Sequence, residues 1–341
     1  MQKVAEQCPE FGILVIGEAG DGKSSLINSL LGVDVAEVGD TTETKTVAIT
    51  AYKADIAGVP VAVYDTPGIN TREVTSDKEV LDCIKVLNKD KKIHLTIFCF
   101  PLREVRLKAN HTKTLKAYQA AGVDWTSTIV ALTFANLINA QTAPKEVCEN
   151  PNFDVAMYFK ERVQMWKKEI RAKLVADVGV PQAKADTLII APVTDDQLES
   201  LPDGDNWFIP LWLDILELLP PAAYVRFLQV HHGKISFTGE RATIHLVGAD
   251  AKRFQEIAER KYSDLKKAGI AALGGVVAAG VAVASGIGGA AALIGISGAL
   301  SFGIAIPLAA VGVAATVGVA AAIGGGVHFM RKYFRRGAES D

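Results

Sequence analysis

The chain has 341 residues, 49% of them hydrophobic, and its 36 Lys and Arg nearly balance its 38 Asp and Glu. This composition is too apolar for a disordered protein, and a net charge of −2 is too balanced for a protein that binds nucleic acid through the phosphates. Four cysteines without a C-x-x-C pair argue against a disulfide scaffold or a zinc module and fit a reducing compartment.

Short apolar runs and amphipathic stretches alternate over residues 1–222. The apolar runs predict strands at Phe11–Ile16, Thr46–Lys53, Val59–Tyr64, Ile93–Phe100, Thr128–Thr133 and Thr187–Ala191, with Thr46–Lys53 at an edge. The amphipathic stretches predict helices at Lys23–Leu31, Asp77–Asn88, Ala109–Ala121, Phe153–Ala176 and Trp207–Leu219. This alternation predicts an α/β fold whose mainly parallel sheet is covered by helices on both faces. Ligands bind such sheets at the carboxyl ends of the strands.

A phosphate-binding loop follows the first predicted strand. The sequence Gly-Glu-Ala-Gly-Asp-Gly-Lys-Ser at residues 17–24 fits G-x-x-x-x-G-K-[ST] and opens a predicted helix, as the motif requires. Lys23 can reach the β- and γ-phosphates, and Ser24 can ligate Mg²⁺. Backbone N–H groups and the helix dipole complete the site. The residues expected to contact the nucleotide here are Gly17, Glu18, Ala19, Gly20, Asp21, Gly22, Lys23, Ser24 and Ser25.

Two further segments suit the same site. Asp65-Thr-Pro-Gly68 follows a predicted strand, so that Asp65 can make an outer-shell contact to Mg²⁺ and the Gly68 N–H can meet the γ-phosphate. Residues 41–46 contain four threonines, one of which could close over Mg²⁺ and the γ-phosphate. The residues alone do not choose among the four hydroxyls.

These motifs resemble the septin-like GTPases of the immune-associated nucleotide-binding (AIG-type) family and the chloroplast import receptors (Toc). The resemblance covers about residues 10–220 and includes the P-loop continuation Lys-Ser-Ser-Leu-Ile-Asn-Ser-Leu-Leu-Gly at residues 23–32. It implies a P-loop GTPase domain that hydrolyses GTP with Mg²⁺. Matching the family's switch threonine favours Thr44, with Thr42 next. The implied metal contacts are then Ser24, Thr44 and Asp65.

The base-binding segment departs from the usual GTPase pattern. Residues 129–136 occupy the place of a strand followed by T/N-K-x-D, so Thr133 opens the motif, Phe134 replaces the Lys and Asn136 replaces the Asp. A carboxylate at the last position accepts hydrogen bonds from guanine N1 and N2, whereas Asn is a weaker acceptor. Guanine is favoured by the resemblance, and a P-loop ATPase stays open. Trp207 is read either as a neighbour of the base or, preferably, as a core residue.

The segments expected to support hydrolysis are also incomplete. Ile69 and Asn70, rather than Gln, follow the D-x-x-G motif, so the isolated monomer should hydrolyse GTP slowly. The import receptors carry an arginine that reaches across a homodimer, and the matching position here is Arg106, with Arg103 as the alternative. The expected catalytic residues are therefore Lys23, Thr44 and Arg106. A solvated surface arginine is the competing interpretation.

The rest of the chain predicts a membrane attachment. Residues 223–267 read as a stalk, with a hairpin around Gly239 followed by an amphipathic helix at Ala249–Lys267. Residues 268–330 carry no charge and could hold two spans, at about 268–294 and 304–329, before a basic tail at 331–341. Basic residues on both sides predict that both ends face the cytosol. A buried soluble hairpin or a Gly/Ala-rich low-complexity segment would give the same composition.

The sequence as a whole favours a membrane-anchored GTPase. It would bind GTP and GDP with Mg²⁺, form a homodimer through its nucleotide face, and act on an effector protein that the sequence does not identify. A GTP-binding switch that hydrolyses almost nothing is one alternative. A self-associating membrane hairpin gated by the GTPase domain is another.

Overall fold

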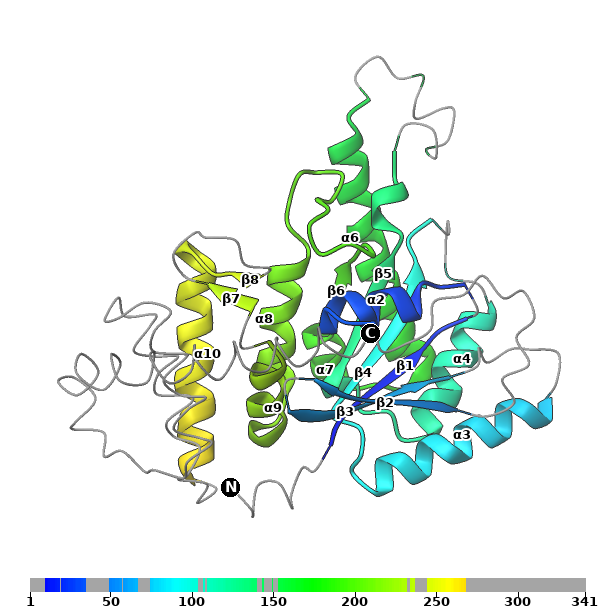
Figure 1. Ribbon diagram of the computed structural model, residues 1–341. Coiled ribbons are helices and arrows are strands. Elements are labelled where there is room, and N and C mark those ends of the chain that lie inside the picture. Colours follow the sequence, from blue (N-terminus) through cyan, green and yellow to red (C-terminus); the bar gives the residue numbers. More distant parts are fainter. Residues whose placement is uncertain are drawn as a thin grey trace, which may run out of the picture. The chain divides into compact units, whose positions relative to one another are not determined.

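The computed structural model describes residues 10–18, 20–34, 49–56, 58–66, 74–103, 107, 109–139, 143, 149, 153–231, 234–236 and 244–267 (Figure 1). The chain divides into two units, Glu10–Val230 and a second unit that comprises Met1–Pro9 and His231–Asp341. The first unit contains every described residue expected at the nucleotide site.

A six-stranded sheet forms the centre of the first unit. Its strands are β1 (Phe11–Ile16), β2 (Thr50–Ile56), β3 (Val59–Asp65), β4 (Leu95–Pro101), β5 (Thr128–Thr133) and β6 (Ile189–Pro192). Their order is β2-β3-β1-β4-β5-β6, and all neighbours are parallel except β2 and β3. The mainly parallel α/β sheet and the edge position of β2 are therefore confirmed.

The edge strand lies further along the chain than the alternation of residues predicts. It runs from Thr50 to Ile56 rather than from Thr46 to Lys53. The antiparallel register pairs Ile56 with Val59 across a tight turn. Gly58 in this turn has a φ of 76° and donates its N–H to Asp55 Oδ1 at 2.8 Å. The turn therefore sets the register, which alternation alone cannot do.

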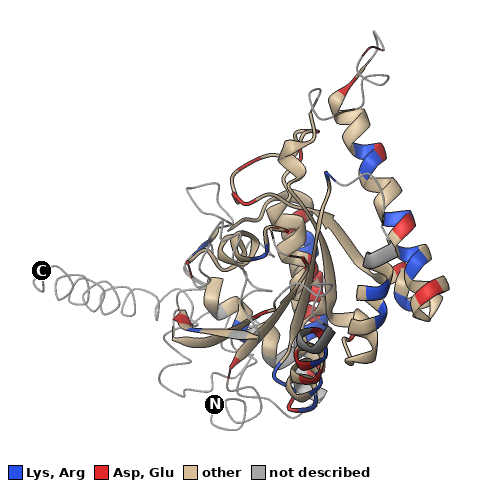
Figure 2. Cartoon of the chain, turned by 90° about the vertical axis from the view of Figure 1, so that its right-hand side faces the viewer, with Lys and Arg blue, Asp and Glu red and all other residues tan. Residues whose placement is uncertain are grey.

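The sheet is covered by helices from both sides. They are α2 (Lys23–Leu31), α3 (Val74–Lys89), α4 (Ala109–Ala120), α6 (Val155–Lys173) with the π-helical turn η3 (Leu174–Val178), α7 (Gln182–Thr187), α8 (Phe208–Leu218) and α9 (Pro221–His231). Two 3₁₀ turns, η1 (Trp125–Ser127) and η2 (Ala135–Leu137), flank β5. Figure 2 shows that Lys, Arg, Asp and Glu are concentrated on the helices, whereas the strands are nearly free of charge.

Aromatic side chains join the helices to the sheet. On one face, Phe98 and Phe100 of β4 lie 5.8 Å from Tyr118 of α4 and 5.8 Å from Trp166 of α6, measured between ring centroids. Elsewhere in the unit, Phe11 of β1 lies 5.6 Å from Phe227 of α9. All six rings are buried, so the sheet has an apolar core beneath its polar carboxyl edge.

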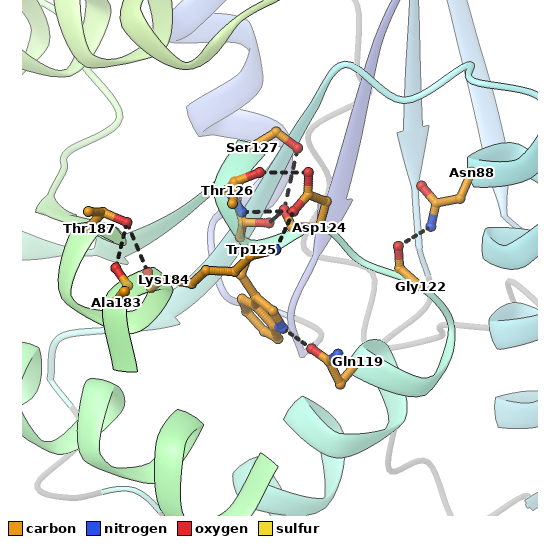
Figure 3. Close-up of polar contacts among 11 residues, drawn as sticks. Asn88, Gln119, Gly122, Asp124, Trp125, Thr126, Ser127, Ala183, Lys184 and Thr187 are labelled. Carbon is orange, nitrogen blue, oxygen red and sulfur yellow. Dashed lines mark hydrogen bonds and ion pairs between the residues drawn. The ribbon is translucent and has the colours of Figure 1, made fainter. Parts of the chain in front are cut away.

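The entry to β5 is held by a compact polar network (Figure 3). Asp124 caps η1, because its Oδ1 accepts from the Thr126 N–H at 3.0 Å and its Oδ2 from the Thr126 hydroxyl at 2.7 Å. The Asp124 carbonyl accepts from the Thr128 hydroxyl at 2.7 Å, and Trp125 donates to Gln119 of α4. These contacts fix where β5 begins and, through its length, where its functional carboxyl end lies.

The boundary of the first unit differs from the predicted residue 222. Helix α9 was not predicted, and the unit continues through it to Val230. Pro221 is the first residue of this helix, where a missing N–H costs nothing because first-turn N–H groups have no helical acceptor. Two consecutive prolines, Pro220 and Pro221, therefore start a helix here rather than end a domain.

In the second unit, one prediction is wrong and one is confirmed. Strands β7 (Ile235–Ser236) and β8 (Ile244–His245) pair in parallel, whereas a hairpin requires antiparallel strands. The amphipathic helix is present as α10 (Gly248–Lys267), with Phe254, Ile257 and Ala258 buried at helical spacing.

The predicted membrane hairpin at residues 268–330 and the tail at 331–341 lie outside the described residues. Among the helices that the structure describes, none combines the length and the apolar composition needed to cross a bilayer.

Candidate nucleotide-binding site

The loop between β1 and α2 has the backbone shape of a phosphate cradle. Gly17, Gly20 and Gly22 have φ values of 147°, 80° and 74°, which other residues rarely adopt. A Cβ atom on Gly17 would lie 2.9 Å from the Cys99 carbonyl oxygen, so β4 also excludes a side chain there. Ala19 lies outside the described residues. The loop thus requires glycine for both conformation and space.

Lys23 is folded back over this loop. Its Nζ donates to the Glu18 carbonyl at 2.8 Å and lies 3.5 Å from the Gly17 carbonyl. Ser24 and Ser25 follow in the first turn of α2 and are half-buried. The ammonium group and the start of α2 therefore provide positive charge at one place, as a polyphosphate requires.

Asp21 is an unusual acid within the cradle. Its side chain is buried, and its Oδ2 accepts the Glu18 N–H at 2.6 Å. Burial raises the pKa of Asp21 to about 7, although the hydrogen bond from Glu18 and the charge of Lys23 oppose this shift. The role of Asp21 in this structure is to brace the loop from inside, with a carboxyl group that can hold a proton near neutral pH.

Asp65 ends β3 beside the loop. The parallel register pairs it with Val15, two residues before Gly17. Burial raises the pKa of Asp65, whereas Lys23 and a hydrogen bond with the backbone of Thr66 lower it. Its Oδ1 is buried and has no hydrogen-bond partner within the described part of the chain. A buried carboxylate oxygen costs free energy unless a donor or cation meets it, so this atom points to a missing ligand.

The residues near Asp65 fit Mg²⁺ better than a metal held by protein alone. Ser24 offers a hydroxyl and Asp65 a carboxylate, and both are hard oxygen donors. The described residues contain no group of three His, Cys, Asp or Glu able to hold a metal. Mg²⁺ typically binds through one or two protein oxygens, with phosphates and water completing the shell. Thr42, Thr44 and Gly68 lie outside the described residues.

A small pocket opens between α2 and the carboxyl ends of β5 and β6. It is lined by Gly22, Ser25, Leu26, Thr133, Phe134, Asn136, Thr194 and Asp195. The pocket thus brings the predicted base residues Thr133 and Asn136 next to the phosphate loop. The Thr133 hydroxyl is buried without a partner among the described residues.

Trp207 is a core residue, which was the preferred of the two interpretations of the sequence. It is 3% exposed, does not line the pocket, and donates its Nε1–H to the Asp196 carbonyl at 2.9 Å.

Arg103 lies between the two halves of the site. Its Cζ is 4.9 Å from the ring centroid of Phe134, which has a φ of 57° and packs beside Gly22. The Arg103 backbone is held by Arg162 of α6, which donates to the carbonyls of Leu102 and Arg103 at 2.9 and 3.0 Å. Arg106 lies outside the described residues, so its position is not tested.

Three contacts of the site were not predicted from the motifs. Arg103 stacks on Phe134, His111 Nε2 lies 3.8 Å from Glu18 Oε1, and the Asn136 amide donates to Glu199 Oε1 at 3.2 Å. The replacement of Lys by Phe134 was a signal for the first, because an aromatic ring invites a cation. The other two join residues far apart in the sequence and had no local signal.

Comparisons with known proteins find one matching family and several related sequences. Residues 11–168 match the AIG1 family. A translocase of chloroplast 34 homolog from Chlamydomonas reinhardtii is 27% identical over 247 residues, which cover 68% of this chain and 59% of that protein. Immune-associated nucleotide-binding protein 3 from Arabidopsis thaliana is 32% identical over 113 residues, which cover 31% of this chain and 32% of that protein.

Solved structures show weaker overall similarity. Toc33 from Arabidopsis thaliana in complex with GDP and Mg²⁺ is 17% identical, covers 72% of this chain and 90% of its own, and has a TM-score of 0.47.

This chain spans about three fifths of the Chlamydomonas relative and less than a tenth of translocase of chloroplast 159 from Arabidopsis thaliana. The family match confirms the resemblance seen in the motifs for residues 11–168, which correspond to an AIG1-family domain.

Proposed function

We propose that this domain binds GTP and GDP with Mg²⁺ between β1 and α2 and hydrolyses GTP slowly. The observation that carries the proposal is that a glycine-rich loop lies beside both the Lys23 ammonium group and a buried Asp65 oxygen, which has no hydrogen-bond partner among the described residues. A cation on one side and an orphaned carboxylate on the other are the two charges that a metal–polyphosphate complex would satisfy.

In the proposed complex, Lys23 exchanges the Glu18 carbonyl for the β- and γ-phosphates. The loop N–H groups and the first turn of α2 hold the phosphate oxygens. Ser24, Asp65 and Thr44, with Thr42 as the alternative, would hold Mg²⁺, and Gly68 would meet the γ-phosphate. Mg²⁺ bound there would neutralise charge that develops on the phosphates.

Slow hydrolysis is expected from the residues that follow the D-x-x-G motif at Asp65. Ile69 and Asn70 supply no Gln to orient the attacking water. We therefore infer that a homodimer through the nucleotide face raises the rate and that Arg106 supplies positive charge to the partner's phosphates. Arg103 is the alternative, since its guanidinium lies over Phe134 beside the phosphate loop. The missing Gln also supports a second function, a switch that binds GTP but hydrolyses almost none.

The attachment of this domain to a membrane is part of the proposal. The uncharged residues 268–330, flanked by Lys266 and Lys267 before and Arg331 and Lys332 after, suit a hairpin with both ends on the cytosolic side. A self-associating hairpin gated by the GTPase domain is favoured by its small residues at four-residue spacing, such as Ala310, Ala314 and Gly318.

Equilibrium binding tests the nucleotide site directly. The full chain in detergent should bind fluorescent GDP and GTP, and GTP binding should weaken when Mg²⁺ is removed with EDTA. Lys23→Ala should lower GTP affinity at least about tenfold, since it removes a charge-assisted contact. Lys113→Ala, at an exposed position of α4, is the matched control and should bind as the wild type.

Asp65→Asn separates the metal from the phosphates. It should reduce the effect of EDTA on GTP affinity, because the carboxylate that faces Mg²⁺ is gone. Wild-type protein that binds no guanine nucleotide, or that binds equally well with Lys23→Ala, would contradict the proposed function.

A further inference from the structure

The base pocket lacks the carboxylate that recognises guanine in most GTPases. Asn136 stands in its place, and Ala191-Pro192-Val193-Thr194, which precedes the pocket on the other side, carries no acid. We propose that Glu199, which Asn136 holds in position, supplies the missing carboxylate and selects guanine. This inference rests on the proposed nucleotide site.

Backbone hydrogen bonds bring the loops after β5 and β6 together. The Val193 N–H donates to the Leu132 carbonyl at 2.9 Å, and the Ala135 N–H donates to the Val193 carbonyl at 3.2 Å. Asn136 is therefore the middle residue of the turn η2, which lies directly across from the loop that follows β6. The pocket between them is lined by Thr133 and Asn136 from one loop and by Thr194 from the other.

A tight turn after β6 then brings Glu199 next to Asn136. The Glu199 N–H donates to the Asp196 carbonyl at 3.2 Å, and the same carbonyl accepts the indole N–H of buried Trp207 at 2.9 Å. Asp196 Oδ1 accepts the Leu198 N–H at 2.8 Å. The turn is thus anchored to the core through Trp207. Its backbone hydrogen bonds fix the position of the Glu199 backbone.

Asn136 lines the pocket, and its side chain links the pocket to Glu199, which lies directly behind it and is not itself a lining residue. The Asn136 amide donates to Glu199 Oε1 at 3.2 Å, and Glu199 is half-buried. An Asp at position 136 would instead place two carboxylates in contact, which is unfavourable. The Asn at position 136 is therefore explained by Glu199: the acid has moved to a neighbouring loop, and Asn136 has become its positioning residue.

The chemistry of the base edge gives the selectivity. Guanine presents two donors, N1–H and N2–H, which one carboxylate can accept together. Adenine presents an acceptor at N1 and would be repelled. A glutamine at position 199 would present one acceptor and one donor, which match the N1–H and O2 of xanthine. Exchange of the acid for the amide should therefore move the preference from guanine towards xanthine.

Asp195 is the rival carboxylate, because it lines the pocket directly. It is exposed at the pocket rim, and the Ser29 hydroxyl of α2 donates to its backbone carbonyl. Within the described part of the chain, Asn136 donates a hydrogen bond to the side chain of Glu199 and none to that of Asp195. Asp195→Asn therefore distinguishes the two assignments.

The test measures competition of GDP, XDP and ADP against fluorescent GDP on the full chain in detergent with Mg²⁺. Wild type should prefer GDP. Glu199→Gln should lower the ratio of GDP to XDP affinity at least about tenfold, the size expected for a bidentate base contact. Asp195→Asn, and Glu161→Gln at an exposed site of α6, should keep the wild-type ratio.

A rescue makes the test independent of folding defects. Asn136→Asp added to Glu199→Gln returns a carboxylate to the pocket and should restore the preference for GDP. An unchanged ratio in Glu199→Gln, or a shift caused by Asp195→Asn, would overturn the assignment while leaving the proposed function intact. Wild type that binds none of the three nucleotides would instead reject the proposed function itself.

Discussion

Two residues of the phosphate loop, Gly17 and Asp21, have features that cost folding free energy. Gly17 combines a φ of 147° with a carbonyl 2.9 Å from where a Cβ would lie, and Asp21 keeps a carboxyl group away from water. Neither feature benefits packing, since an ordinary turn would need neither. Both follow from wrapping the backbone so that its N–H groups point into one cavity.

Gly17→Ala should destabilise the fold by about 2 kcal/mol, the scale of a strained backbone together with a steric clash. Gly204→Ala is the matched control, because its φ of 85° gives the backbone penalty while nothing lies within 4 Å of the added Cβ. Urea unfolding should show a larger loss for Gly17→Ala than for Gly204→Ala. Equal losses would mean that the contact with Cys99 does not matter.

Asp21 should make stability depend on pH. Burial raises the pKa of folded Asp21 to about 7, above its ordinary value of 3.8, so the folded state holds a proton that the unfolded state releases between these two pH values. The contribution to stability is therefore present at low pH and is lost as pH rises towards 7.

Asp21→Asn should accordingly gain stability relative to wild type at pH 8 but much less at pH 5, with a difference on the order of a few kcal/mol. Unfolding at both pH values measures this difference, and Asp205→Asn at an exposed loop position is the control. A variant whose advantage is the same at both pH values would show that Asp21 does not titrate in this range.

At the scale of elements, helix α6 holds the loop that follows β4. Asp154 caps the helix by accepting the N–H groups of Ala156 at 2.8 Å and Met157 at 3.3 Å. Two turns later, Arg162 fixes the carbonyls of Leu102 and Arg103. The cap of α6 therefore influences how firmly Arg103 is held beside Phe134.

Asp154→Ala should destabilise the protein by about 1 kcal/mol, the usual loss for an N-cap acceptor. Asp154→Asn keeps an acceptor and should stay within a few tenths of wild type. Thermal unfolding compares the two. A loss of the same size in both would assign the effect to the negative charge at the helix start rather than to the cap.

The same scale separates what sequence can predict from what it cannot. Buried parallel strands such as Phe11–Ile16 and Thr128–Thr133 were predicted at their exact bounds, because each is a continuous apolar run. Short α7 was missed because six residues are too few to show a helical period. Helix α9 was missed although Ala223, Phe227 and Val230 recur at helical spacing, because it begins at two prolines, which are typical of a helix boundary. The β7–β8 pairing was predicted with the wrong direction, because two-residue strands carry no directional pattern.

The nucleotide site likewise contains residues that the sequence predicts and a contact that it does not. Lys23, Asp65 and the loop glycines are contiguous with strand ends, so local motifs place them. The Asn136–Glu199 contact joins positions 63 residues apart and depends on how two loops are tied together. Only the folded chain brings that pair into contact.

At the scale of the whole molecule, the account depends on a second copy of the chain. Arg106→Ala should lower GTP turnover at high protein concentration about tenfold or more, because a trans-acting arginine stabilises charge that develops during transfer. The affinity for GDP should change little, since the arginine acts on the partner's phosphates. Arg103→Ala, measured in parallel, decides between the two arginines.

The most direct test of the central claim is GTP turnover by the full chain in detergent over a hundredfold range of protein concentration, with ATP in parallel. The account predicts a specific rate that rises with concentration for GTP and remains lower for ATP. Tight GTP binding with a flat, negligible rate would contradict dimer-activated hydrolysis and favour the non-hydrolysing switch. Equal turnover of ATP would contradict guanine selection.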